Sequence, residues 1–270
     1  MMNFMKGSLF SRNQLKPPQE DLEPDVQVLA VWGSPGSGKT TVSVRLAKYL
    51  ADHKRNALLL LCDMTAPMLP CICANSELEC ERSLGSILAA THITDTLIRQ
   101  NCITLKKMGY LTIIGMLKGE NMYTYPPYTP ELATELIDHL RDIAPYVIID
   151  CSSYIAYDIL SAVSLLEADT VLRLVNCDLK SVSYLSSQLP LLQDQKWDAD
   201  KQYKAASNVK SNQAGEHIEQ VLGSMAFQIP HSYELENLAL AGNLLGELAL
   251  KDSRGFRSEI AKIAKEVFGV

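Results

Sequence analysis

Short runs of apolar residues recur along the chain from residue 26 onwards. They are five to seven residues long, rich in Val, Leu and Ile, and nearly continuous, as expected of strands that are buried on both faces of a sheet. We predict strands at residues 26–32, 57–62, 111–115, 146–150, 170–175, 202–208 and 225–230.

Stretches with the spacing of amphipathic helices separate these runs. We predict helices at residues 41–53, 83–97, 130–143, 182–193, 214–222 and 253–268. Alternation of strand and helix predicts an α/β fold, with a mostly parallel sheet and helices on both of its faces.

The first 24 residues break this pattern, because they are polar, contain three prolines and have no clear period. We expect residues 1–24 to form a tail or linker and residues 25–270 to form one domain. A net charge of -6 argues against a general nucleic-acid-binding surface. Seven scattered cysteines, without an export signal or a long apolar span, favour a cytoplasmic protein.

The strongest chemical signal is GSPGSGKT at residues 33–40, directly after the first strand and at the start of the first helix. It matches the P-loop pattern G-x-x-x-x-G-K-[ST], in which glycines let backbone amides wrap phosphate groups. Lys39 would add a full charge, and Thr40 would offer a hydroxyl to Mg²⁺. The predicted phosphate-binding residues are Gly33, Ser34, Pro35, Gly36, Ser37, Gly38, Lys39, Thr40 and Thr41.

Two strands end in an aspartate that suits a P-loop site. Asp150 closes YVIID and is expected to bind Mg²⁺ directly or through water; the alternative is a helix cap. Asp63 follows ALLLLC and could orient the attacking water or contact Mg²⁺; the alternative is a solvated cap. Lys39, Asp63 and Asp150 are thus the predicted catalytic residues, and Thr40, Asp63 and Asp150 the predicted metal-binding ones.

Together these motifs resemble the MinD, ParA and CpaE/TadZ families of P-loop ATPases, and the resemblance extends from about residue 26 to the C-terminus. It implies that Asn208, at the end of QYKAASN, contacts the adenine base, and that Pro230 lies in the loop beside the base. It also implies ATP and Mg²⁺ as ligands, a nucleotide-dependent homodimer, slow hydrolysis, and control of attachment to a protein apparatus, a membrane or DNA.

Two departures from that resemblance bear on turnover. Ser34 occupies the position of the family's signature lysine, and Cys151, Ser152 and Ser153 replace the usual proline or glycine after Asp150. A serine cannot supply a charge to a partner's phosphates. The resemblance makes an ATP-dependent positioning or assembly switch the leading hypothesis, in pilus assembly, secretion, conjugation or DNA partitioning, and the Ser34 departure motivates the adaptor alternative. The alternatives are a nucleotide-binding adaptor without turnover and a small-molecule phosphotransferase.

Three further segments carry weaker signals. Cys71, Cys73 and Cys80 could bind a metal, but their spacing favours free cysteines. The tyrosine- and proline-rich segment 119–130 could dock a protein or pack on its own domain. The amphipathic segment 253–268 could lie on a membrane, although packing within the domain is the simpler expectation.

Overall fold

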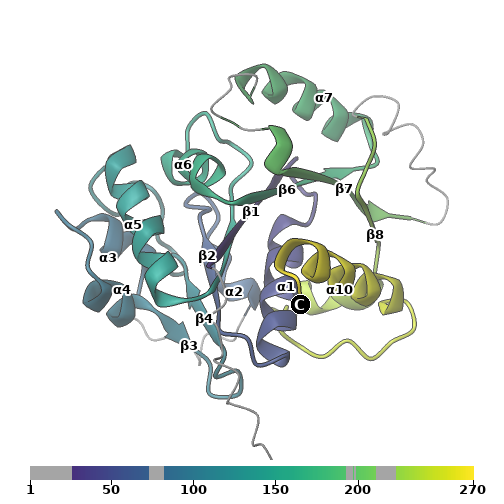
Figure 1. Cartoon of the computed structure of the whole chain (residues 1–270), viewed down its shortest axis with the longest axis horizontal. Coiled ribbons are helices and arrows are strands. Elements are labelled where there is room, and N and C mark those ends of the chain that lie inside the picture. The colour runs from purple at the N-terminus through teal and green to yellow at the C-terminus, as the bar shows by residue number, and fades with distance from the viewer. Residues whose placement is uncertain (1–25, 73–81, 193–196, 198, 211–222) are drawn as a thin grey trace, which may run out of the picture.

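The computed structural model describes residues 26–72, 82–192, 197, 199–210 and 223–270. Its strands form one sheet in the order β3-β4-β2-β5-β1-β6-β7-β8 (Figure 1). The strands are β1 (Gln27–Gly33), β2 (Ala57–Leu61), β3 (Ile103–Thr104), β4 (Leu111–Ile114), β5 (Tyr146–Asp150), β6 (Thr170–Asn176), β7 (Gln202–Val209) and β8 (Phe227–Pro230). All neighbouring pairs are parallel except β3 and β4, which are antiparallel.

Helices cover both faces of this sheet, with α1 and α10 on one side and α5 and α6 on the other (Figure 1). The helices are α1 (Lys39–Asp52), α2 (Leu69–Ile72), α3 (Leu84–Leu88), α4 (Asp95–Asn101), α5 (Pro130–Ile143), α6 (Ile159–Glu167), α7 (Leu179–Gln188), α9 (Tyr233–Leu240) and α10 (Arg254–Phe268). Short 3₁₀ turns lie at Leu189–Leu192 and Ala199–Lys201.

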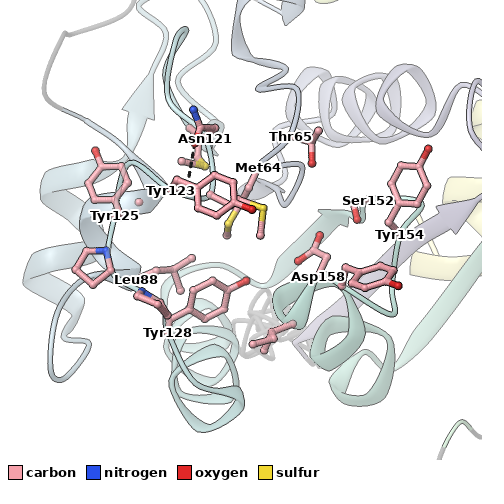
Figure 2. A pocket seen from close by; sticks show the side chains of 17 residues that line it. Met64, Thr65, Leu88, Asn121, Tyr123, Tyr125, Tyr128, Ser152, Tyr154 and Asp158 are labelled. Carbon is pink, nitrogen blue, oxygen red and sulfur yellow. Dashed lines mark hydrogen bonds between the residues drawn. The ribbon is translucent and has the colours of Figure 1, made fainter.

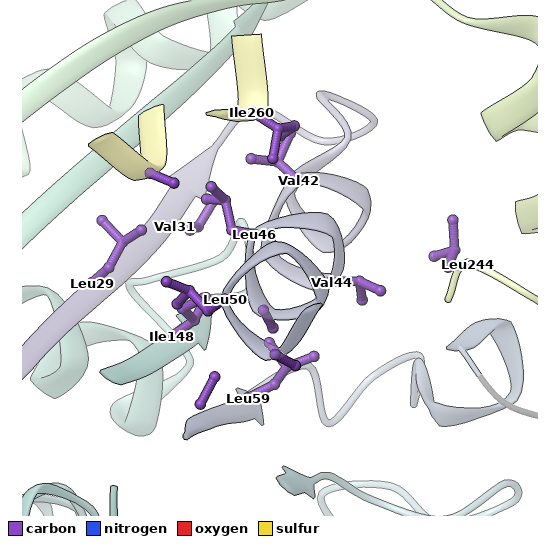
Figure 3. Close-up of a cluster of buried hydrophobic side chains, with 14 of the residues drawn as sticks. Leu29, Val31, Val42, Val44, Leu46, Leu50, Leu59, Ile148, Leu244 and Ile260 are labelled. Carbon is purple, nitrogen blue, oxygen red and sulfur yellow. The ribbon is translucent and has the colours of Figure 1, made fainter. Parts of the chain in front are cut away.

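The two faces of the sheet support separate cores, since successive residues of a strand point to opposite faces. In β1, Leu29 and Val31 pack under α1 and α10 (Figure 3). Val28 and Ala30 point to the other face, under α5 and α6. Every residue of β2 and of β5 is buried, which explains why these strands are continuous apolar runs rather than alternating ones.

The predicted α/β fold and its seven strands are confirmed. The helical sequence expected around 83–97 forms two helices: α3 ends at residue 88, and α4 begins after its cap Thr94. Helix α6 and the antiparallel strand β3 were not predicted. The expected tail at 1–24 and helix at 214–222 lie outside the described residues.

The C-terminal helix α10 packs within the domain. Its apolar residues Phe256, Ile260 and Ile263 are buried in the same core as α1. This confirms internal packing as the role of its apolar face. Nor does any helix within the described ranges have the length and apolar character needed to cross a bilayer.

Candidate functional site

The P-loop lies at the carboxyl end of β1, in the centre of the sheet between β5 and β6. A Cβ atom at Gly33 would lie 1.9 Å from the carbonyl oxygen of Leu174 on β6, so this turn tolerates no side chain. Gly38 has φ 77° and forms the N-cap of α1, a conformation that favours glycine. The sequence therefore folds as strand, tight turn and helix, as the pattern predicted.

The N-terminus of α1 suits an anion. Its first amides have no intrahelical acceptor, and Gly38 provides no side-chain cap. The N-termini of α5 and α6, in contrast, are capped by Thr129 and Asp158. Ser37 Oγ is buried and has no hydrogen-bond partner among the described residues. An uncapped helix dipole beside a buried donor fits a phosphate group.

Lys39 links the P-loop to the segment after β5. Its Nζ donates to Ser153 Oγ at 2.6 Å and lies 3.4 Å from the carbonyl oxygen of Ser34. Burial lowers the pKa of Lys39, and the charges of Asp150 and Asp63 oppose this effect. Two carboxylates therefore help to keep the lysine charged in a largely buried position.

Asp150 and Thr40 form the predicted metal-binding pair. Thr40 Oγ1 donates to Asp150 Oδ2 at 2.6 Å, and Ser43 Oγ lies 3.3 Å from Oδ1. Burial raises the pKa of Asp150 to about 6, against the opposing effects of Thr40, Lys39 and Ser43. A hydroxyl and a carboxylate are the oxygen ligands that Mg²⁺ uses together with substrate phosphates. These two side chains thus fit the ion, although within the described ranges no group of three or more His, Cys, Asp or Glu residues could hold a metal unaided.

Asp63 lies at the same edge of the sheet, one residue beyond Cys62, whose amide donates to the Asp150 carbonyl. Its Oδ1 accepts from the amides of Thr65 at 2.8 Å and Ala66 at 2.9 Å, so it caps the turn that follows β2. The carboxylate is half-buried and close enough to affect the pKa of Lys39. The structure thus brings Asp63 to the site, and its catalytic and metal roles remain predictions.

A cavity of about 430 Å³ opens beside the P-loop, between the ends of β6, β7 and β8. Thr41, Asn208 and Pro230 line it, and the contact of Asn208 and Pro230 with a base remains a prediction. Asn208 has φ 53°, and its Nδ2 donates to Asn176 Oδ1 at 2.9 Å. Asn176 in turn donates to the carbonyl oxygen of Gly36 at 3.1 Å. The sequence patterns did not identify Asn176, although its position as the polar last residue of β6 is a usable signal.

The side chain of Ser34, which the resemblance aligns with a signature lysine, points into the protein. Ser34 is fully buried, and its Oγ donates to Ser181 Oγ on α7 at 3.0 Å. From the same helix, the Tyr184 hydroxyl donates to the carbonyl oxygen of Ser153. Helix α7 therefore contacts both the P-loop and the segment that holds Lys39.

Of the three cysteines considered as metal ligands, the structure describes only Cys71. Cys71 is a free, half-buried thiol, while Cys73 and Cys80 lie outside the described residues. Cys151 and Cys62 are buried at the ends of β5 and β2, and burial raises the pKa of the Cys62 thiol.

Comparison with known proteins places these features in a family. A family model described as an AAA domain matches residues 27–205, which include the P-loop, Asp63 and Asp150. The chain belongs to this family. A comparison with curated protein sequences gave no significant match.

Solved structures share the fold of this AAA domain along nearly their whole length. A ParA family ATPase from Chlorobium tepidum is 17% identical, with a TM-score of 0.73, and the match covers 88% of this chain and 98% of that one. The septum site-determining protein MinD from Pyrococcus horikoshii, complexed with Mg-ADP, is 16% identical, with a TM-score of 0.66 and coverage of 90% and 96%. The MinC:MinD cell division protein complex of Aquifex aeolicus contains a chain that is 16% identical, with a TM-score of 0.68 and coverage of 91% and 97%. The predicted MinD/ParA type of fold is thereby confirmed.

Proposed function

We propose that the protein is an ATP-binding, slowly hydrolysing P-loop ATPase that acts as a nucleotide-dependent positioning or assembly switch. The observation that carries this proposal is the convergence of Lys39, Thr40 and Asp150. The P-loop lysine and hydroxyl lie within hydrogen-bond reach of groups on the segment that closes β5. Because the P-loop residues that would bind phosphate also contact the segment after β5, a bound γ-phosphate could change the conformation of that segment.

The P-loop from Gly33 to Thr41 would bind the phosphates through its amides and through the charge of Lys39. Asn208 and Pro230 would contact the base in the cavity between β6, β7 and β8, where Asn176 holds the loop in place. The solved structure of MinD with Mg-ADP supports an adenine nucleotide, since its fold is shared over most of both chains.

Thr40 and Asp150 would hold Mg²⁺, with Asp63 as a further ligand or as the group that orients water. The bound ion would neutralise charge on the nucleotide phosphates. The hydrogen bond between Thr40 and Asp150 keeps the two oxygen donors adjacent. Both amide contacts of Asp63, with Thr65 and Ala66, are made by Oδ1, so Oδ2 would contact the water or the ion.

A nucleotide-binding adaptor without turnover is a second candidate, and the burial of Ser34 favours it. A buried serine bonded to Ser181 offers no cation to a phosphate of a partner subunit. Hydrolysis would require Lys39 and a cation supplied by another molecule, and without that cation the protein would bind nucleotide and not turn it over.

The output would be a nucleotide-controlled contact with another molecule. A homodimer is one such contact, and the MinC:MinD complex supports a protein partner as another. A cytoplasmic apparatus for pilus assembly, secretion, conjugation or DNA partitioning suits this mode of action. We favour a protein partner over direct contact with DNA or membrane, because the net charge is -6 and the apolar face of α10 is buried.

The proposal is tested by measuring ATP turnover and molar mass with and without Mg·ATP, for the wild type and for Lys39→Ala. The switch predicts slow turnover and a dimer for the wild type, and neither for Lys39→Ala. A wild type that binds ATP yet stays monomeric and inactive would replace the switch with the adaptor. A wild type that binds no nucleotide would refute both.

A further inference from the structure

A second cavity, of about 240 Å³, lies beyond the carboxyl ends of β2, β4 and β5 (Figure 2). Met64, Met116 and Ser152 line it, and each follows the end of one of these strands by a few residues. The cavity is therefore at the same edge of the sheet as the P-loop. Its lining is rich in tyrosine and methionine side chains, and the proposed nucleotide site uses none of them.

Five tyrosines surround this cavity, from the segment 119–130 and from the loop before α6. They are Tyr123, Tyr125, Tyr128, Tyr154 and Tyr157. Tyr123 is 88% exposed and Tyr157 is 85% exposed, which is unusual for such large rings. Tyrosine and methionine are enriched where proteins dock, since both contribute contact area with little polar surface.

The inner walls of the cavity are fixed before any ligand arrives. Tyr125 donates to Glu120 Oε1 at 2.6 Å, and its ring occupies the space where a Cβ atom on Gly85 would lie, 2.1 Å away. The Tyr128 hydroxyl accepts from the amide of Leu160 at 3.1 Å, which ties the segment to α6. A preformed pocket loses less entropy when a side chain enters it.

One carboxylate faces this aromatic surface. Asp158 lines the cavity and accepts from the amide of Ser161 at 3.2 Å and from its hydroxyl at 2.6 Å. Burial raises the pKa of Asp158, against the opposing effect of its hydrogen bonds with Ser161, because desolvation disfavours the ionised form. None of the described residues that line the cavity is Lys, Arg or His. The pocket therefore combines the negative faces of tyrosine rings with an acidic group, and both attract a cation.

We propose that this pocket receives a lysine or arginine side chain of a partner protein. The charged head would lie between Asp158 and the tyrosine rings, and the aliphatic stem would pack along the methionines. The volume of about 240 Å³ is below the roughly 300 Å³ at which sites for free small molecules begin, and it suits one long side chain. Charge complementarity thus selects a basic segment as the occupant.

This pocket also contacts the segment that reaches the P-loop, so the inference rests on the proposed switch and names the surface that its partner would use. The amide of Ser152 donates to Ser161 Oγ, which also bonds to Asp158. The next residue, Ser153, holds Lys39. A side chain that binds at Asp158 would therefore touch the element that we expect to respond to nucleotide.

The test uses the full chain labelled with ¹³C-methyl methionine, titrated with N-acetyl-arginine methylamide and with its neutral analogue, N-acetyl-citrulline methylamide. We expect saturable shifts of the methyl signals of Met64, Met116 and Met122 with the arginine compound alone. Met108, which precedes β4 at the opposite edge of the sheet, serves as the reference signal.

Two variants and one matched control complete the test. Asp158→Asn keeps a side chain able to cap α6, and it should weaken binding of the arginine compound at least tenfold. Tyr157→Ala removes an exposed ring and should weaken binding at least threefold, whereas Tyr110→Ala, at the other edge, should leave binding unchanged. Absence of saturable shifts, equal binding of both compounds, or unchanged affinity in Asp158→Asn would overturn the inference.

Mg·ATP binding measured on the same samples separates this inference from the proposed function. Asp158→Asn and Tyr157→Ala should bind Mg·ATP like the wild type, since neither residue contacts the P-loop. Arginine binding by a protein that binds no ATP would refute the switch and leave the pocket supported. ATP binding without binding of the arginine compound would refute the pocket and leave the nucleotide site supported.

Discussion

The replacement of Ser34 by lysine tests whether the signature position of the P-loop can face outwards in this chain. Ser34 is fully buried, and its hydroxyl donates to Ser181 on α7. A lysine there would either lie in the core without its charge or force the loop to rearrange. Ser34→Met is the matched control, because methionine has a similar length and no charge.

The magnitude follows from the free energy of deprotonation. A free lysine has a pKa of about 10.4, so keeping the amine neutral at pH 7 costs about 5 kcal/mol at about 1.36 kcal/mol per pH unit. The pKa of the introduced amine is then lower in the folded than in the unfolded state. The unfolded state therefore binds more protons than the folded state. The free energy of unfolding of Ser34→Lys rises with pH until the pH exceeds the pKa of the lysine in the unfolded state. At pH 9 the cost falls to about 2 kcal/mol.

Urea unfolding of both variants at pH 7 and pH 9 measures this cost. We expect Ser34→Lys to be less stable than Ser34→Met by up to about 5 kcal/mol at pH 7, and the difference to shrink by more than half at pH 9. The comparison between variants removes the titration of all other groups. A difference below about 0.5 kcal/mol at both pH values would show that residue 34 reaches solvent, and would refute the inward orientation.

Three further predictions concern the P-loop and its neighbours. In EDTA without nucleotide, Asp150→Asn should stabilise the protein by up to about 3 kcal/mol at pH 8, because the pKa of Asp150 rises from 3.8 to about 6 on folding. Urea unfolding should show that this gain vanishes by pH 4, and a loss of stability at pH 8 would contradict the prediction. Gly33→Ala should lower the free energy of unfolding by about 3 kcal/mol, because its Cβ would lie 1.9 Å from the Leu174 carbonyl oxygen on β6. Gly109→Ala is the control: a Cβ there would have no atom within 4 Å, so the free energy of unfolding should change by less than about 0.5 kcal/mol. Equal effects of the two substitutions would refute the steric argument. Asn176→Ala removes a hydrogen bond to the P-loop and should lower ATP affinity about fivefold in calorimetry, for a net loss of about 1 kcal/mol; unchanged affinity would exclude a positioning role.

Local sequence patterns were sufficient for the sheet and for the phosphate-binding loop. Strands β1, β2 and β5 are buried on both faces, so each is a short apolar run that can be recognised in the sequence alone. The P-loop was predictable because its local backbone conformation requires glycine, for example in the left-handed N-cap at Gly38. Asp150 was predictable because carboxyl ends of parallel strands gather at one edge.

Features that depend on packing between distant segments were not predictable. Helix α6 is short and mostly apolar, and Ser161 and Ser164 are buried, so its sequence does not separate a buried helix from a buried strand. Its cap Asp158 is isolated in the sequence. The inward orientation of Ser34 depends on Ser181, a residue 147 positions away. The tyrosines of segment 119–130 were predicted either to dock a partner or to pack internally, and the structure divides them: Tyr123 is exposed, whereas Tyr128 is partly buried against α6.

Calorimetric titration of Mg·ATP into the wild type and into Lys39→Ala tests the central claim most directly. The account predicts a single saturable site in the wild type, no measurable binding by Lys39→Ala, and at least tenfold weaker binding when Mg²⁺ is replaced by EDTA. Equal binding by the two proteins, or no binding by the wild type, would contradict the assignment of residues 33–41 as the nucleotide site.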